Sequence, residues 1–184
     1  MVYHMTVAGL ERDLPICPVN ENLSIAGFVI FGDQELTVAC ARELLKKAPE
    51  YDYIITAEAK GIPLAHEMAR QAGDAKYFVA RKGSKLYMRD TFGVAVRSIT
   101  TDREQHLYLD GSDAKLIKGK RILVLDDVIS TGESLTALEA LVEKAGGIIC
   151  GRMAILAEGE AKDRKDIIYL EPLPLFNPDG TPKG

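Results

Sequence analysis

The stretch RILVLDDVISTGES, residues 121–134, decides the fold. Residues 122–125 form an unbroken apolar run with branched side chains, which is typical of a strand buried on both faces of a parallel sheet. Asp126 and Asp127 follow where such a strand is expected to leave the sheet. A Ser-Thr-Gly turn then leads into a helical pattern of apolar residues over 135–142. The stretch therefore predicts a strand, a short polar loop and the first turn of a helix.

That order of elements is suited to binding phosphate. Backbone N–H groups at a helix N-terminus have no partner inside the helix, and the helix dipole is positive there. The hydroxyl groups of Ser130, Thr131 and Ser134 add further donors. The alternative is an ordinary strand-to-helix turn that has a serine or threonine cap and no ligand. A Walker A loop is excluded because no G-x-x-x-x-G-K-[ST] pattern occurs in the chain.

The two aspartates restrict the kind of phosphate ligand. Two carboxylates would repel a bare phosphate. The ligand is therefore expected either to offer hydroxyl donors, such as a ribose 2′,3′-diol, or to carry a divalent cation. A ribose 5-phosphate unit meets the needs of the aspartates and of the phosphate loop at once.

Two other predicted strands end in loops that carry cations. Residues 53–57, YIITA, precede Lys60 and Gly61, and a proline then opens a helix. Residues 76–80, KYFVA, precede the basic segment RKGSK at 81–85. Ligands in open α/β sheets lie at the carboxyl ends of the strands, where these loops are expected to converge. A solvated charged turn is the alternative for each loop.

Composition bounds the class of protein. The chain has 184 residues, 47% of them hydrophobic and 27% charged, which is enough for one domain with a full core. The net charge of −4 argues against nucleic acid as a partner. The three cysteines show neither metal nor disulfide spacing, which predicts a cytoplasmic location. No apolar run reaches membrane-spanning length, so no membrane partner is expected.

The alternation of strands and helices predicts an α/β fold, with a mostly parallel central sheet of about five strands and helices on both faces. We expect a single domain over residues 1–184, with a core at about 33–158. Residues 1–32 and the chain end at 159–176 are expected to form a small hood over the strand tips.

Local patterns place several smaller elements. Residues 92–101 and 106–110 are expected to form a β-ribbon with its turn at 102–105. Residues 111–119 are expected to be a connection, and residues 158–164 a charged loop.

The segment LVLDDVISTGES, residues 123–134, resembles the signature of type I phosphoribosyltransferases, which bind 5-phosphoribosyl 1-pyrophosphate. The loop EAKG at 58–61 is similar to the pyrophosphate loop of the purine branch, with a lysine where arginine is usual. The segment RKGSK at 81–85 is similar to the flexible lid of the family. The resemblance spans about 33–158 and is nearest to adenine and xanthine enzymes. It departs at Glu133, where glycine is frequent.

The resemblance implies a role for each loop. The implied catalytic residues are Asp126, Asp127, Lys60, Arg81 and Lys85. The implied 5-phosphate ligands are Val128, Ile129, Ser130, Thr131, Gly132, Glu133 and Ser134. The implied pyrophosphate ligands are Ala59, Lys60, Gly61, Arg81, Lys82 and Lys85. The implied purine contacts are Phe28, Ile129 and Glu158.

The resemblance also implies the reaction and its partners. Ribose 5-phosphate would pass from 5-phosphoribosyl 1-pyrophosphate to a purine base in purine salvage, with release of pyrophosphate. The cofactor Mg²⁺ would be held mainly by the substrate, without a dedicated protein ligand. A homodimer is expected, and a strained non-proline peptide is expected between Ala59 and Lys60, cis in at least one state. The rival function is a non-catalytic regulatory domain that senses the same ligand.

The base stays open between xanthine or another 6-oxopurine and adenine. Adenine enzymes usually have a glutamate after the basic lid, where this chain has Thr100 or Thr101. Xanthine enzymes tend to have a lysine at the position of Gly159. The first difference favours a 6-oxopurine, and the second weakens the case for xanthine itself.

Overall fold

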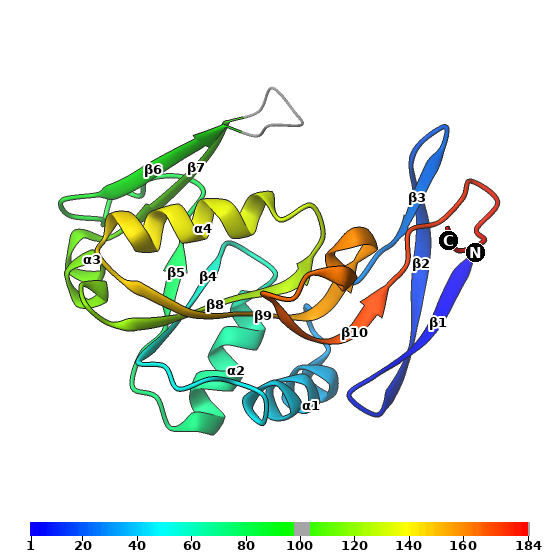
Figure 1. Ribbon diagram of the computed structural model, residues 1–184, viewed down its shortest axis with the longest axis horizontal. Helices are drawn as coiled ribbons and strands as arrows, with labels where there is room; N and C mark the ends of the chain where they lie inside the picture. The colour runs from blue at the N-terminus through cyan, green and yellow to red at the C-terminus, as the bar shows by residue number, and fades with distance from the viewer. Residues whose placement is uncertain (98–103, 184) are drawn as a thin grey trace.

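The computed structural model describes residues 1–97 and 104–183. Its centre is a five-stranded parallel sheet, and the α/β prediction is confirmed (Figure 1). Helices α1 (Gln34–Leu45) and α2 (Ile62–Ala72) cover one face, and α4 (Glu133–Lys144) covers the other. The strands lie in the order β10 (Ile168–Leu173), β9 (Ile148–Glu158), β8 (Arg121–Ile129), β4 (Tyr53–Ala57) and β5 (Phe78–Ala80).

Strand β8 is buried on both faces, as its apolar run predicts. Leu123 and Leu125 pack in the cluster formed with α1 and α2, and Ile122 and Val124 pack in the cluster formed with α4. All four side chains are fully buried. Successive strand residues point to opposite faces, so an unbroken apolar run is what a strand between two helical layers needs.

Strand β8 is longer than predicted and carries both aspartates within it. It pairs with β9 as far as Ile129, which lies opposite Ala157. Its pairing with β4 stops at Leu125, which lies opposite Thr56. The expectation that the strand ends before Asp126 is therefore wrong, because the ladder with β9 holds the aspartate backbone extended after β4 has turned away.

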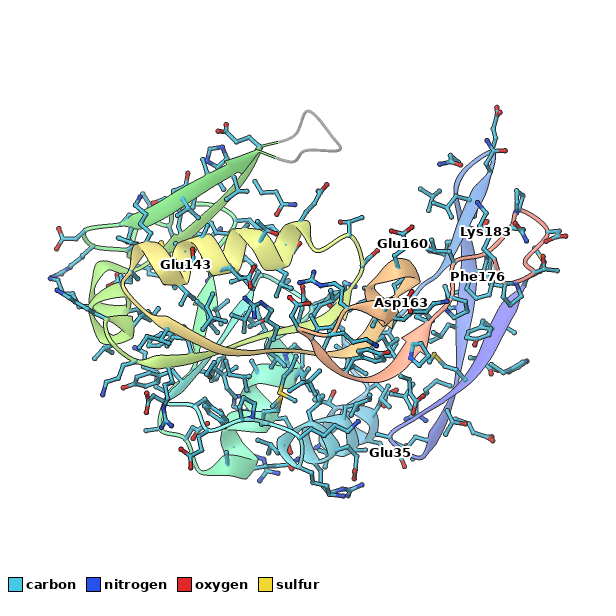
Figure 2. All side chains as sticks on the ribbon, viewed as in Figure 1. Glu35, Glu143, Glu160, Asp163, Phe176 and Lys183 are labelled. Carbon is cyan, nitrogen blue, oxygen red and sulfur yellow. The ribbon has the colours of Figure 1, made fainter. Side chains whose placement is uncertain are left out.

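The N-terminal segment forms an antiparallel sheet of β1 (Val2–Val7), β2 (Leu10–Asn20) and β3 (Leu23–Ala26). The chain end lies against it through Phe176, whose buried ring meets Tyr3 edge-on with 5.1 Å between the ring centroids (Figure 2). Before it reaches these strands, the chain end contributes β10 to the edge of the central sheet.

Several smaller elements differ from their prediction. Strands β6 (Phe92–Arg97) and β7 (Glu104–Leu109) form the expected ribbon, but β7 starts inside the predicted turn, whose other residues lie outside the described part. Helix α3 (Gly111–Ile117) replaces the expected connection, and the 3₁₀ helix η1 (Gly159–Asp163) replaces the charged loop. Both helices are too short to show an apolar period. Among the described residues, no helix is long and apolar enough to cross a membrane.

Candidate active site

The three loops expected to bind a ligand follow three strands that are neighbours in the sheet, β8, β4 and β5. All three strands are parallel, so the loops leave from the same edge. The loop after β4 spans 58–61, the loop after β5 spans 81–91 and begins with the basic segment 81–85, and the loop after β8 leads into α4. The fold therefore brings together segments that lie far apart in the chain.

An ion pair joins two of these loops. Lys60 Nζ lies 2.9 Å from Oδ2 of Asp127. The Asp127 side chain is 4% exposed, whereas the Lys60 side chain is 45% exposed. A buried carboxylate requires a partner because its desolvation is costly. The lysine loop thus supplies the charge that Asp127 needs, and the two predicted catalytic residues lie in direct contact.

The carboxyl group of Asp126 has a different environment from that of Asp127. Its Oδ1 accepts a hydrogen bond of 2.9 Å from the backbone N–H of Asp127. Burial, with the adjacent carboxylate of Asp127 as a second cause, raises the pKa of Asp126 to about 7. Lys60 therefore pairs with the carboxylate of Asp127, whereas Asp126, with its pKa of about 7, is partly protonated near neutral pH.

Gly61 allows the lysine loop to lie directly on the sheet. A Cβ atom built on Gly61 would lie 2.1 Å from Oγ1 of Thr56, a fully buried residue of β4. It would also lie 3.5 Å from Cα of Asp126. The backbone of Gly61 is in the right-handed helical region (φ −71°), so the requirement for glycine is one of space alone.

The cis peptide of this loop lies one bond earlier than predicted. It joins Glu58 to Ala59, whereas the bond between Ala59 and Lys60, predicted to be cis in at least one state, is not cis in this structure. Strand β4 ends at Ala57, so the loop already turns at Glu58.

Glu58 links the lysine loop to the basic loop, a role that sequence reasoning missed. One carboxylate oxygen accepts from the N–H of Lys82 at 2.9 Å, and the other lies 3.0 Å from Nη2 of Arg81. These contacts, that of Lys82 above all, hold the pKa of Glu58 below its ordinary value. Arg81 also donates to the hydroxyl of Tyr87 at 2.8 Å. No sequence motif marks this carboxylate, because its partners follow a different strand.

The loop after β8 forms a hollow of about 90 Å³ at the N-terminus of α4. Gly132 is the N-cap residue and has φ +82°, a conformation that favours glycine. Its carbonyl accepts from the hydroxyl of Thr136 at 3.0 Å, within the first turn of the helix. The hollow is lined by Asp126, Val128, Ile129, Ser130, Thr131, Gly132, Glu133, Ser134 and Leu135. All seven predicted 5-phosphate residues lie here together.

The predicted purine residues belong to different packing environments. Phe28 is 4% exposed and packs in the core cluster of α1 and α2. Ile129 belongs to the opposite cluster, and Glu158 is the last residue of β9. Thr100 and Thr101 lie outside the described residues.

The donor set of the site fits a magnesium ion carried by the substrate. Mg²⁺ takes oxygen ligands and is commonly bound by one or two carboxylates together with substrate phosphates. Asp126 and Asp127 are two of the carboxylates at this edge, and Asp127 is engaged by Lys60. In the part of the chain that the structure describes, no group of three or more His, Cys, Asp or Glu residues is arranged to hold a metal.

Comparisons with known proteins agree with this geometry. A family model described as the phosphoribosyl transferase domain matches residues 31–172. The chain is 31% identical over 159 residues to a hypoxanthine/guanine phosphoribosyltransferase from Methanococcus voltae, which covers 86% of this chain and 81% of that protein. It is 36% identical over 162 residues to the protein of the same name from Methanococcus vannielii, with coverage of 84% and 83%.

Solved structures show the same fold. The adenine phosphoribosyltransferase of Thermoanaerobacter pseudethanolicus aligns with a TM-score of 0.68 at 20% identity, over 86% of this chain and 95% of that chain. The sheet and its three loops thus define a phosphoribosyltransferase fold. The chain belongs to the phosphoribosyl transferase domain family, which confirms the resemblance, and its relatives are enzymes of the purine branch.

The space at Gly61 leads to a first prediction. Gly61→Ala is expected to destabilise the protein by about 1–3 kcal/mol, because the new methyl group overlaps Oγ1 of Thr56. Thr56→Ala removes that oxygen, so the double variant is expected to regain most of the loss in urea-unfolding experiments. Equal losses in the single and double variants would contradict this account of the loop.

The raised pKa of Asp126 leads to a second prediction. Between about pH 4 and 7 the folded protein binds a proton here that the unfolded chain releases, so this group makes the free energy of unfolding fall as pH rises. Asp126→Asn is expected to match wild type below pH 4. It should become more stable than wild type by at least about 1.4 kcal/mol above pH 7, the value of one pKa unit.

Asp179→Asn provides a control of opposite sign. The Thr181 hydroxyl lowers the pKa of Asp179, so this carboxylate adds stability as pH rises. Stability curves for Asp126→Asn and wild type that run parallel from pH 4 to 8 would rule out the raised pKa of Asp126.

Proposed function

We propose that the protein transfers ribose 5-phosphate from 5-phosphoribosyl 1-pyrophosphate to a purine ring nitrogen and releases pyrophosphate. The observation that carries this proposal is the ion pair between Lys60 and Asp127, which joins the predicted pyrophosphate loop to the predicted ribose site. Membership of the family and the purine relatives support it.

Three parts of the donor would meet the three loops. The 5-phosphate would occupy the hollow at the start of α4, where the helix N-terminus offers N–H donors. The ribose hydroxyls would donate to Asp126 and Asp127. The pyrophosphate would meet the backbone of residues 59–61 and the cations of residues 81–85.

Bond cleavage would build positive charge on the ribose and negative charge on the leaving group. The two aspartates would offset the positive charge at the ring. Lys60, Arg81, Lys82 and Lys85 would stabilise the leaving pyrophosphate. Lys60 would exchange Asp127 for pyrophosphate as the donor binds, which its partly exposed side chain permits. Mg²⁺, when bound with the substrate, would supply further neutralising charge.

We infer that the base is a 6-oxopurine. The relatives from Methanococcus voltae and Methanococcus vannielii, at 31% and 36% identity, are named for hypoxanthine and guanine, whereas the likeness to the adenine enzyme is at 20% identity. The segment before α1 alternates in exposure, with Phe28 and Ile30 buried and Val29 and Phe31 more than half exposed. If this segment contacts the base, Phe31 is its available aromatic ring, whereas Ile129 and Glu158 remain the candidates from the sheet edge.

The remaining expectations form part of the same proposal. We propose a single domain with a hood from both chain ends, because the backbones of Phe176 and Ser24 pair. A homodimer is proposed on the family resemblance. A cytoplasmic location is proposed because the three cysteines have no disulfide partner. Sedimentation of the purified protein would test the dimer.

The direct test is an assay of pyrophosphate release with hypoxanthine, guanine, xanthine and adenine. We expect turnover that depends on 5-phosphoribosyl 1-pyrophosphate, with kcat/KM at least tenfold higher for a 6-oxopurine than for adenine, because a pocket built for a carbonyl leaves polar groups unpaired with an amino group. A preference for adenine would overturn the base assignment. Binding of the donor without turnover of any base would favour the rival regulatory function.

A variant of the phosphate loop sharpens the assay. Thr131→Leu is expected to raise the KM for 5-phosphoribosyl 1-pyrophosphate at least tenfold, because the larger side chain fills the hollow and removes a donor. Thr6→Leu, the same change at an exposed position of β1, is the matched control. Unchanged donor kinetics in a folded Thr131→Leu protein would remove the 5-phosphate assignment.

A further inference from the structure

The phosphate loop contains no cation of its own. Residues 126–135 contain Asp126, Asp127 and Glu133, and no lysine or arginine. A phosphate group carries close to two negative charges near neutral pH. Helix dipole and N–H donors favour an anion there, but the loop's own side chains oppose it. Lys60 offsets the charge of Asp127, so a cation that serves the phosphate itself has to come from another part of the chain.

The structure brings one arginine to the loop from a distant part of the sequence. Arg164 follows η1, and its Nη1 would lie 2.8 Å from a Cβ atom built on Gly132, the N-cap of α4. Figure 1 shows η1, in orange, beside the loop between β8 and α4, and Figure 2 labels Asp163, the last residue of η1. The guanidinium thus occupies the space that a side chain at position 132 would fill.

Asp166 fixes the direction of this guanidinium. Arg164 Nε donates to Oδ1 of Asp166 at 2.9 Å, and Nη2 donates to Oδ2 at 2.6 Å. This two-point contact uses one side of the planar fork and leaves Nη1 as the nitrogen toward Gly132. Asp166 is itself 3.8 Å from Nε of Arg152, which pairs with Glu139 of α4. The arginine is therefore tied to the same helix whose N-terminus forms the hollow.

We propose that Arg164 is a binding residue for the 5-phosphate of the donor, and that Asp166 is its positioning residue. The inference rests on the proposed function, because the phosphate in question is that of 5-phosphoribosyl 1-pyrophosphate. Arg164 supplies from behind Gly132 the positive charge that residues 126–135 lack. Gly132 is required for this contact as well as for its backbone angle, since any side chain there would displace the guanidinium.

The site gives a reason for the order of residues near the chain end. Arg164 and Asp166 are two positions apart, between η1 and β10, where the sequence pattern indicates only a charged connection. Strand β10 pairs with β9, whose last residues lie opposite the end of β8. The end of β9 therefore brings η1, and Arg164 after it, to the phosphate loop.

The test measures the affinity of the full chain for two ligands that differ in the 5-phosphate. With Mg²⁺ present, calorimetry would give Kd for 5-phosphoribosyl 1-pyrophosphate and for pyrophosphate. Arg164→Gln is expected to weaken the first at least tenfold and to leave the second within twofold. Arg164→Lys keeps the charge without the planar guanidinium, so its Kd for 5-phosphoribosyl 1-pyrophosphate should lie between those of Arg164→Gln and wild type. Asp166→Asn should weaken donor binding by less than Arg164→Gln does.

Lys165→Gln is the matched control. It removes the same charge from the next residue, which is exposed, and should change neither Kd by more than twofold. If Arg164→Gln behaves like Lys165→Gln, or weakens both ligands equally, Arg164 has no role in the 5-phosphate site. If wild type does not bind the donor at all, the proposed function fails first and the inference falls with it.

Discussion

The contact between Lys60 and Asp127 is the interaction on which the site depends. It requires a nearly buried carboxylate on β8 and a lysine on the loop after β4, within 2.9 Å of each other. That distance is reached only because the lysine loop lies on the sheet, and the loop lies there only because position 61 has no side chain. The parallel pairing of β4 with β8 then sets the two residues at one edge. The close packing at Gly61 thus positions the lysine loop and the aspartates of β8 so that one substrate can contact both.

Three carboxylate–cation pairs lie at the site, this contact among them. Asp127 is matched by Lys60, Glu58 by Arg81 and Asp166 by Arg164. Three of the cations proposed to meet a substrate group, Lys60, Arg81 and Arg164, therefore have a protein carboxylate as partner. Such partners hold the cations in place and reduce their mutual repulsion, and an incoming phosphate group of higher charge can replace them. The arrangement favours ligands with several negative charges over those with one.

The sequence predicted the parts of this site that lie within one segment of chain. The run 122–125, the lysine at 60 and the loop 128–134 were recognisable because period, turn chemistry and spacing are local properties. Glu58 and Arg164 were missed because their partners come from other strands, and only sheet order brings them together. The extension of β8 beyond Asp126 was missed for the same reason, since the pairing with β9 maintains it. Phe28 fits an apolar contact by type, but its ring is used by the core.

The central claim is that one donor molecule spans the loop at 59–61 and the hollow at 130–134 across the Lys60–Asp127 contact. A crystal structure with Mg²⁺ and a stable carbocyclic analogue of 5-phosphoribosyl 1-pyrophosphate tests it most directly. The account predicts the 5-phosphate at the N-terminus of α4, the pyrophosphate on the backbone of residues 59–61, and Lys60 turned from Asp127 toward pyrophosphate. An analogue bound with its ends exchanged, or bound away from both loops, would contradict it.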